Sequence, residues 1–210
     1  MKKICFLLLC MLSVSGVIAQ DNTYNLTVYK EYKPAVLHMV SGRTVNNPLT
    51  NVFLKNGALL YKQGDDVMEL NMATITAADF GDDHYIKIED RLALFVDSVG
   101  RNQLYSVSLV DLDSYRAMLR NNVNITHLDF GGDQLQYTTI DLELQEGQTL
   151  PVINIFYYYY NGKIVRVHER DLYRILTKDK KRMYKTVISM EGFKWTDPDS
   201  LMKLLKAISD

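Results

Sequence analysis

Between Pro34 and Val110 the chain alternates short apolar runs with turn residues, a pattern typical of antiparallel strands. Glycine and asparagine mark many of the turns, as in Ser41-Gly42, Asn56-Gly57 and Gly100-Arg101-Asn102. The expected strands cover 35–40, 43–47, 51–55, 58–62, 67–71, 74–80, 85–89, 92–99 and 103–110. This close and regular spacing predicts an antiparallel meander, folded as a twisted sheet or a small barrel.

Helical periodicity follows Val110. Asp111 is the expected N-cap of a helix over 111–121, whose apolar residues recur at helical spacing. Strands are expected at 123–129 and 134–144 around Gly131-Gly132, and the strongest hairpin joins 152–160 to 163–168. Further helices are expected at 169–176 and 178–185, and a last one has Pro198 in its first turn and Thr196 or Asp197 as its cap.

The pattern as a whole predicts a β-rich α+β fold. An N-terminal antiparallel meander over 34–110 is followed over 111–210 by a sheet that contains a hairpin and two to four helices. The boundary near Val110 is soft, because no long linker marks it. The two regions are therefore either separate domains or one compact unit.

Two Asn-Gly dipeptides set the expected register of their hairpins. A two-residue type I′ turn at Asn56-Gly57 pairs Leu54 with Leu59 and Val52 with Tyr61, which places all four on one apolar face. The same arithmetic at Asn161-Gly162 pairs residues 157–160 with residues 163–166.

The first 19 residues have the three parts of a secretory signal peptide. Lys2 and Lys3 precede an apolar run over 4–12, and small residues lead to the expected cleavage between Ala19 and Gln20. The apolar run is too short to span a bilayer, so an uncleaved anchor is the weaker alternative. We therefore expect a periplasmic or extracellular protein, with 20–33 forming a loose leader or an edge strand.

Composition narrows the classes of function. Both cysteines, Cys5 and Cys10, lie in the signal, so the mature chain would have neither a disulfide nor a thiolate metal site. The full chain has 24 basic and 25 acidic residues, a balance that shows no basic field for nucleic acid. Hydrophobic residues make up 47% of the chain, an ordinary value for a globular domain.

The tyrosine run 157–160 provides the candidate binding site. One face of its hairpin would carry Tyr157, Tyr159, Arg166 and His168, with Tyr157 opposite Arg166 as a cation–π pair. Aromatic, cationic and imidazole groups on a rigid hairpin could bind a ligand or a protein partner. The alternative is an ordinary sheet face covered by a C-terminal helix.

Other polar features have simpler explanations. The run Lys178-Asp179-Lys180-Lys181-Arg182 could touch anionic lipid or polysaccharide, but it also fits a solvated helix face. The acidic turns 64–66 and 81–84 fit local turn chemistry, so we expect neither a metal nor a cofactor. His168, Glu169 and Asp171 are the nearest approach to a catalytic set, although the two acids also suit the first turn of a helix.

Three segments carry a resemblance to a family. These are Asn51–Lys62, Asp179–Lys185 and Ser200–Ile208, and the chain that contains them resembles an uncharacterised family of secreted proteins from Bacteroides-type Gram-negative bacteria. The resemblance implies export. It implies no activity and assigns no residue a role.

The leading functional hypothesis is an exported, non-catalytic binding or interaction module of the cell envelope. Its partner is unknown, with an envelope protein or a glycan as candidates and no nucleic acid expected. One alternative is a secreted hydrolase of envelope or dietary polymers, which needs two carboxylates, or a histidine with an acid and a hydroxyl, in one cleft. The other is a structural subunit that pairs through exposed strands.

Overall fold

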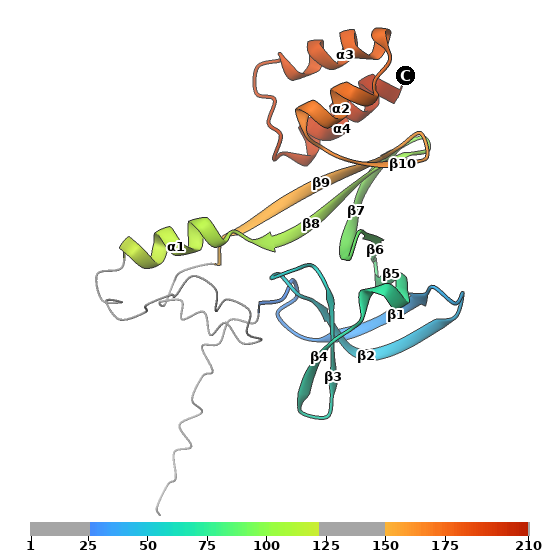
Figure 1. Cartoon of the computed structure of the whole chain (residues 1–210), viewed down its shortest axis with the longest axis vertical. Coiled ribbons are helices and arrows are strands. Elements are labelled where there is room, and N and C mark those ends of the chain that lie inside the picture. The colour runs from blue at the N-terminus through green and yellow to red at the C-terminus, as the bar shows by residue number, and fades with distance from the viewer. Residues whose placement is uncertain (1–25, 122–149, 210) are drawn as a thin grey trace, which may run out of the picture.

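The computed structural model describes residues 26–121 and 150–209, which form a mostly β fold of the α+β class (Figure 1). The expected signal peptide, its cleavage site and the strands expected within 123–144 lie outside these residues. The strands are β1 (Lys33–Met39), β2 (Thr44–Val52), β3 (Leu59–Gln63), β4 (Asp66–Glu69), β5 (Ile75–Phe80), β6 (Asp83–Ile88), β7 (Arg91–Val99), β8 (Asn102–Val110), β9 (Val152–Tyr160) and β10 (Lys163–Arg166). The helices are the 3-10 turn η1 (Met72–Thr74), α1 (Leu112–Asn121), α2 (Glu169–Ile175), α3 (Lys178–Ile188) and α4 (Pro198–Ser209).

All ten strands belong to one antiparallel, curled sheet in the order β10-β9-β8-β7-β6-β5-β1-β2-β3-β4. Two meanders, β1–β4 and β5–β10, are joined where β1 pairs with β5. Directly opposed residues of six successive strands form one row on a single face, namely Leu37, Ala78, Tyr85, Leu94, Ser106 and Phe156. The sheet therefore continues past Val110, through the pairing of β8 with β9.

One strand is longer than its sequence predicts. The expected strands at 43–47 and 51–55 are largely joined in β2, which contains Pro48. The register between β1 and β2 shifts between Lys33 and Ala35, so Pro34 lies opposite the segment that contains Pro48. Proline lacks the N–H that a regular ladder needs, and a bulge is one of the places where a strand tolerates it.

The turn at Asn56-Gly57 differs from the predicted two-residue turn. Val52 pairs with Leu59 rather than with Tyr61, and Phe53 and Ala58 close a four-residue loop. The main-chain N–H of Leu92 donates to the oxygen of Gly57, and that of Val110 donates to the oxygen of Leu54. The loop thus bonds to β7 and β8 at the ends where these two strands no longer pair with each other. Because the register moves by two residues, Val52, Leu59 and Tyr61 keep the shared face predicted for them. Leu54 does not join them: it lies in the loop and packs with Leu26, Val110 and Tyr115.

The hairpin at Asn161-Gly162 has its predicted register. Tyr160 pairs with Lys163 and Tyr157 with Arg166. Asn161 and Gly162 both have positive φ, of 50° and 80°, as a type I′ turn requires.

Three helices cover one face of the sheet at its β10 end (Figure 1). Leu201, Leu204, Leu205 and Ile208 of α4 pack with Leu172, Tyr184 and the strand residues Phe156, Tyr158 and Tyr160. Asp197 caps α4 as one of the two predicted caps, since its side chain accepts the N–H of Ser200 at 2.9 Å. In the part of the chain that the structure describes, no helix is long and apolar enough to cross a membrane.

Candidate functional site

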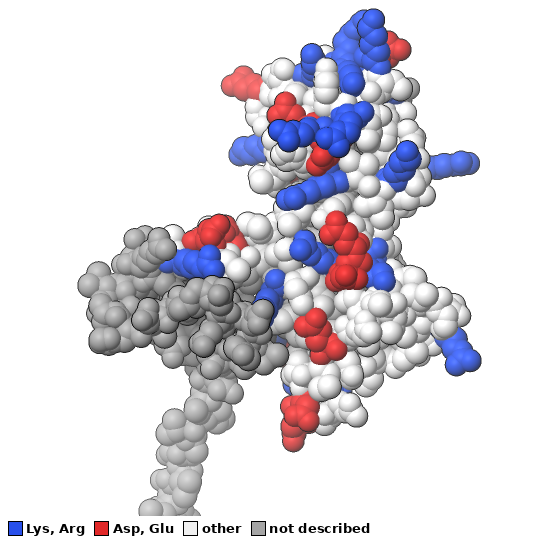
Figure 2. Space-filling view, viewed as in Figure 1, with Lys and Arg blue, Asp and Glu red and all other residues white. Residues whose placement is uncertain are grey.

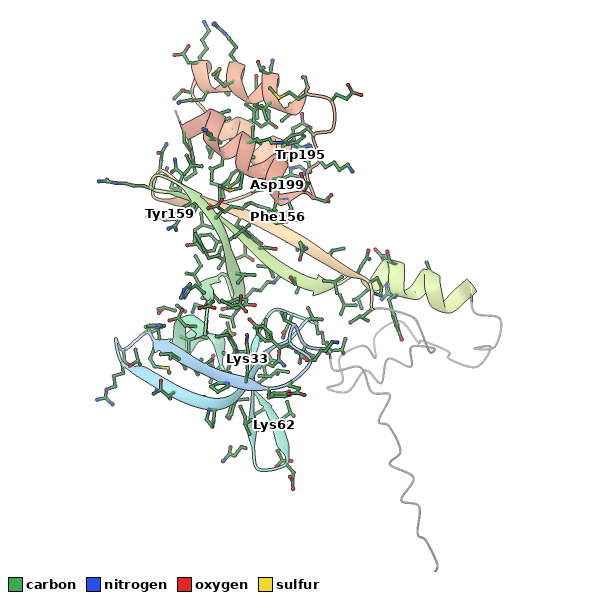
Figure 3. The ribbon with its side chains drawn as sticks, turned by 180° about the vertical axis from the view of Figure 1, so that it is seen from behind. Lys33, Lys62, Phe156, Tyr159, Trp195 and Asp199 are labelled. Atoms are coloured by element: carbon green, nitrogen blue, oxygen red, sulfur yellow. The ribbon has the colours of Figure 1, made fainter. Side chains whose placement is uncertain are left out.

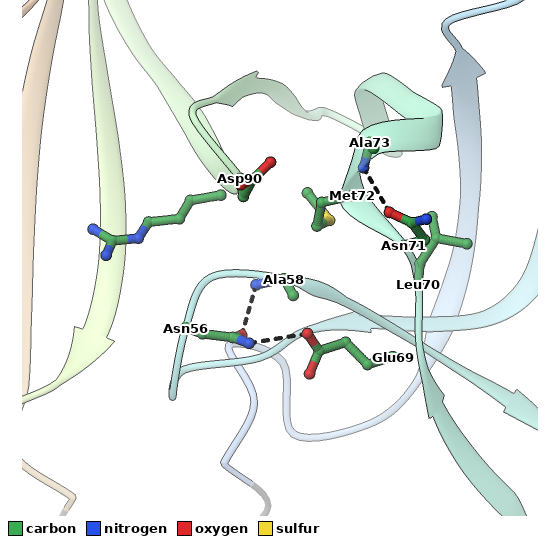
Figure 4. A pocket seen from close by; sticks show the side chains of 9 residues that line it. Asn56, Ala58, Glu69, Leu70, Asn71, Met72, Ala73 and Asp90 are labelled. Atoms are coloured by element: carbon green, nitrogen blue, oxygen red, sulfur yellow. Dashed lines mark hydrogen bonds between the residues drawn. The ribbon is translucent and has the colours of Figure 1, made fainter. Parts of the chain in front are cut away.

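An open cleft of about 500 Å³ lies where the end of β4 and η1 approach the turn between β6 and β7 (Figure 4). Its polar border consists of Asn56, Glu69, Asn71, Asp90 and Arg91. Its apolar lining includes the buried side chains of Ala58 and Met72. Amide and carboxylate groups therefore border a small apolar floor, with Arg91 at one side.

Three of the polar groups are held by local hydrogen bonds. Asn56 accepts the N–H of Ala58 at 3.0 Å and donates to Glu69 at 3.0 Å, so its amide orients that carboxylate (Figure 4). Asn71 caps η1 by accepting the N–H of Ala73 at 3.0 Å. These bonds fix one wall of the cleft before any ligand arrives.

The opposite wall begins at a strained turn. Glu89 has φ of 57°, and it shares a positive φ only with Asn161 and seven glycines among the described residues. A left-handed conformation costs most residues other than glycine and asparagine about 1 kcal/mol or more. The two-residue connection Glu89-Asp90 between Ile88 and Arg91 thus holds Asp90 and Arg91 at the cleft in a tight turn with an unusual residue at its positive-φ position.

Gly57 fixes how closely the β2–β3 loop approaches Arg91. Its φ is 77°, and a Cβ at this position would lie 3.0 Å from the Cβ of Arg91 and 3.4 Å from Val107. The Gly57 oxygen also accepts the N–H of Leu92 at 2.8 Å. Asn56 and Arg91 are therefore brought to one cleft by a contact that only glycine allows without adjustment.

The predicted hairpin site is divided by the structure. Tyr157, Tyr159 and Arg166 share the face opposite the helices, since they alternate with the buried Phe156 and Tyr158. Tyr157 is only 6% exposed, in a cluster with Tyr105 and Val107. Tyr159, which is labelled in Figure 3, is 36% exposed. The helices therefore cover the other face of this hairpin, contrary to the alternative expectation that they cover this one.

His168 does not join the other three in the ladder. It precedes α2 at the cap position, exposed, with Nδ1 4.0 Å from Asp171 of the same helix. The predicted cation–π pair between Tyr157 and Arg166 is not formed, because the cation–π contacts of the described residues all involve lysines. Glu169 and Asp171 lie in the first turn of α2, where their charge is favourable.

Two polar groups outside the cleft are well organised. Asp79 accepts from Nε2 of His38 at 2.6 Å and from Nδ1 of His84 at 2.9 Å. Tyr29 donates to Asp83 at 2.7 Å, and Lys33 lies 3.2 Å from the same carboxylate. The described residues include no group of three or more histidine, cysteine, aspartate or glutamate side chains arranged to hold a metal ion.

Hydrogen bonds displace the pKa values of several carboxyl groups among the described residues. Partial burial raises the pKa of Asp79, but the hydrogen bonds from His84 and His38 outweigh this effect and leave the pKa below its ordinary value. The pKa of Asp83 is lowered chiefly by the Tyr29 hydrogen bond. Within the described ranges, each carboxyl group whose pKa is displaced moves downward, the opposite of what a general acid needs at neutral pH.

Sequence reasoning missed the cleft. Its polar residues come from three segments, near 56, 69–71 and 90–91, and no motif joins them. One local signal was present, because Glu89-Asp90 separates two apolar runs without the glycine or asparagine found in the other short turns. Comparisons with protein-family models, with curated proteins and with solved structures found no match.

Proposed function

We propose that the protein is an exported, non-catalytic binding module of the cell envelope, and that the cleft beside the β6–β7 turn is its ligand site. The observation that carries this proposal is that the side chains of Asp90 and Arg91 are not bonded to other side chains or to the main chain of the described residues. Both border the cleft, and within the described part of the chain neither side chain forms a hydrogen bond or an ion pair. The hydrogen-bonding groups of both side chains are therefore free to bind a ligand. The strained turn at Glu89 holds them at the cleft, although no other described residue makes a bond with them.

The chemistry of the border indicates the class of ligand. Arg91 offers up to five N–H donors, while Asp90 and Glu69 accept, and the amides of Asn56 and Asn71 do both. A ligand rich in hydroxyl or amide groups, such as a glycan or a peptide, would match this mixture. Because about 500 Å³ is the size of an ordinary small-ligand pocket, a few sugar units or residues would fit.

Export rests on the N-terminal sequence. The order of basic, apolar and small residues over 1–19 is the pattern of a signal peptide, with cleavage after Ala19. Both cysteines fall within it, so folding of the remaining chain would be independent of the redox state of the compartment. The proposed location is the periplasm or the exterior of the cell.

The test is a binding titration with the purified protein. Soluble oligosaccharides and short peptides are screened by changes in amide NMR signals, and each hit is repeated with Asp90→Asn and Arg91→Met. Methionine keeps the apolar stem that lies beside Gly57. The control is Asp97→Asn, at the other end of β7.

We expect the two cleft variants to weaken binding by about tenfold or more, since each removes a charged hydrogen bond. The control should bind as the wild type does. Signal changes that cluster away from the cleft, or equal affinities for all variants, would contradict the proposal.

A hydrolase remains a second candidate because Glu69 and Asp90 border the same cleft. Two carboxylates in one cleft are what glycoside hydrolysis needs. If the wild type released products from a bound oligosaccharide while Glu69→Gln and Asp90→Asn did not, the hydrolase would replace the binding module.

The strand-pairing alternative has less support, since the outer strands β4 and β10 have four residues each and short edges discourage pairing.

A further inference from the structure

The helical end of the molecule carries a strong positive charge. Residues 163–209 include 12 basic and 6 acidic residues, a net charge of +6, whereas the whole chain has a net charge of −1. None of these 12 cations lies within ion-pair distance of a carboxylate among the described residues. Figure 2 shows the blue side chains gathered at this end, while blue and red mix over the strands.

Two lysines of α3 lie beside a tyrosine of α2. Lys178, Lys181, Arg182 and Lys185 recur at i, i+3, i+4 and i+7, so they share one side of α3. The ammonium groups of Lys181 and Lys185 lie 4.6 Å and 5.6 Å from the ring centre of Tyr173 on α2. Two exposed arginines of α2 complete the group, which we call the basic surface: Arg170, Arg174, Lys178, Lys181, Arg182 and Lys185, with Tyr173.

Six unpaired cations on adjoining helices repel one another, and an anionic partner would relieve that repulsion. Folding does not explain the arrangement, because α2 and α3 are held by Leu172, Tyr184 and Val187 on their buried sides. The basic surface is therefore available for a partner with closely spaced negative charges.

We propose that the basic surface docks on an anionic phospholipid bilayer. Tyr173 is 37% exposed among the cations, and an amphipathic ring of this kind is suited to the headgroup level of a membrane. Clusters of four to eight basic residues are typical of proteins that bind anionic lipid, and the exposed ring of Tyr173 adds a contact that a soluble polyanion would leave unused.

The geometry is compatible with a flat surface. Figure 1 shows α3 at one end of the described structure and the β3–β4 hairpin at the other. A molecule that docked through α2 and α3 would leave the cleft beside β4 and η1 clear of the bilayer, because the cleft lies among the strands and not on the helices. This inference goes beyond the proposed ligand site and does not depend on it, because the two surfaces share no residue.

The experiment is co-sedimentation of the purified protein with vesicles. One set contains phosphatidylcholine alone, and in the other part of it is replaced by phosphatidylglycerol. The test variant is Arg174→Glu with Arg182→Glu, and the matched control is Arg43→Glu with Arg101→Glu. All four arginines are exposed, and both pairs change the net charge by the same amount. Far-UV circular dichroism verifies that each variant is folded.

We expect binding to the phosphatidylglycerol vesicles alone. The test variant should bind them at least about tenfold more weakly, while the control keeps most of its affinity. Raising the ionic strength from about 0.1 M to about 1 M should also release the wild type, because the Debye length falls from about 10 Å to about 3 Å.

Three results would overturn the proposal. These are absence of binding to either vesicle, equal binding by the test and control variants, and binding to soluble heparin or to an acidic peptide without binding to vesicles. The third would assign the basic surface to a soluble polyanion. If the ligand titration of the cleft fails, the results of the vesicle experiment are unaffected. The proposed ligand site and the proposed membrane surface can therefore be refuted independently of each other.

Discussion

The hydroxyl of Tyr158 donates a 2.6 Å hydrogen bond to the main-chain oxygen of Leu201, which ties the C-terminal half of β9 to α4. Tyr160, two residues along the same face, donates at 2.8 Å to the oxygen of Ile208 in the same helix. Tyr159 lies between them and points to the opposite face. Three adjacent tyrosines therefore have two structural roles, which a single substitution at each can separate.

Removing these hydroxyls should affect stability in the order of their contacts. We expect Tyr158→Phe to lower the free energy of unfolding by about 1–2 kcal/mol, because it deletes a fully buried hydrogen bond. Tyr160→Phe should cost about 1 kcal/mol, and Tyr159→Phe less than about 0.5 kcal/mol. Urea unfolding measures all three. Equal losses at 158 and 159 would contradict the assignment of Tyr158 to the helix contact.

Gly57→Ala should destabilise the fold more than Gly81→Ala. Both glycines have positive φ, so alanine is strained at each by about 1 kcal/mol. A Cβ at 57 would also press on Arg91 at 3.0 Å, whereas a Cβ at 81 meets nothing within 4 Å. We expect a total loss of about 2–3 kcal/mol at 57. Thermal unfolding of the two variants measures the difference, and equal shifts would show that the loop does not need this approach.

The two Asn-Gly turns show what sequence patterns can and cannot predict. At Asn161-Gly162 both strands continue directly from the turn, so local chemistry alone sets the register. At Asn56-Gly57 the loop also bonds to Leu92 and Val110, more than thirty residues away, and these contacts select a longer loop. The shared face of Val52, Leu59 and Tyr61 was still predicted correctly, because a shift of two residues leaves each side chain on the same side of the sheet. The prediction was wrong for Leu54, which the longer loop places in another cluster.

The helix caps at Asp111 and Asp197 were predictable, because capping depends only on residues within the first turn of the helix. Both side chains accept a main-chain N–H at the start of their helix. The candidate site was less predictable. The predicted group of Tyr157, Tyr159, Arg166 and His168 assumed that His168 continues β10, but the strand ends at Arg166. The cleft could not be predicted from the sequence, because the curl of the sheet brings its residues together from separate segments.

The pair of histidines on Asp79 should make stability fall in acid. Because the pKa of Asp79 lies below its unfolded value, its contribution is fully present above that value, near 4, and is lost as pH falls through the folded pKa. Asp79→Asn should therefore be less stable than the wild type at pH 7, and the difference should shrink below about pH 4. Melting temperatures from pH 7 to pH 3 test this, with exposed Asp82→Asn as the control. A constant difference would contradict the linkage.

Burial at Tyr184 predicts the opposite dependence in alkali. Desolvation, with a smaller contribution from the charge of Glu169, raises the pKa of Tyr184 to about 12. A raised pKa means that the neutral ring favours the folded state, so this stability is fully present below about pH 10 and is lost as pH rises toward 12. In Tyr184→Phe the decline between pH 10 and 12 should be shallower. Denaturant midpoints across this range measure it, and an unchanged slope would refute the assignment.

Glu89 offers a direct test of the strained turn beside the cleft. Glycine adopts φ near 57° without the penalty of a side chain, but it loses more freedom on folding, so the two effects largely offset each other. We expect Glu89→Gly to raise the free energy of unfolding by about 0.5 kcal/mol, whereas Asp90→Gly, at a position without positive φ, lowers it by about 0.5–1 kcal/mol. Urea unfolding gives both values. If the cleft is the ligand site, Glu89→Gly should also weaken binding, because a freer turn no longer holds Asp90 and Arg91 in place. A stabilised variant with full affinity would show that the strain has no part in binding.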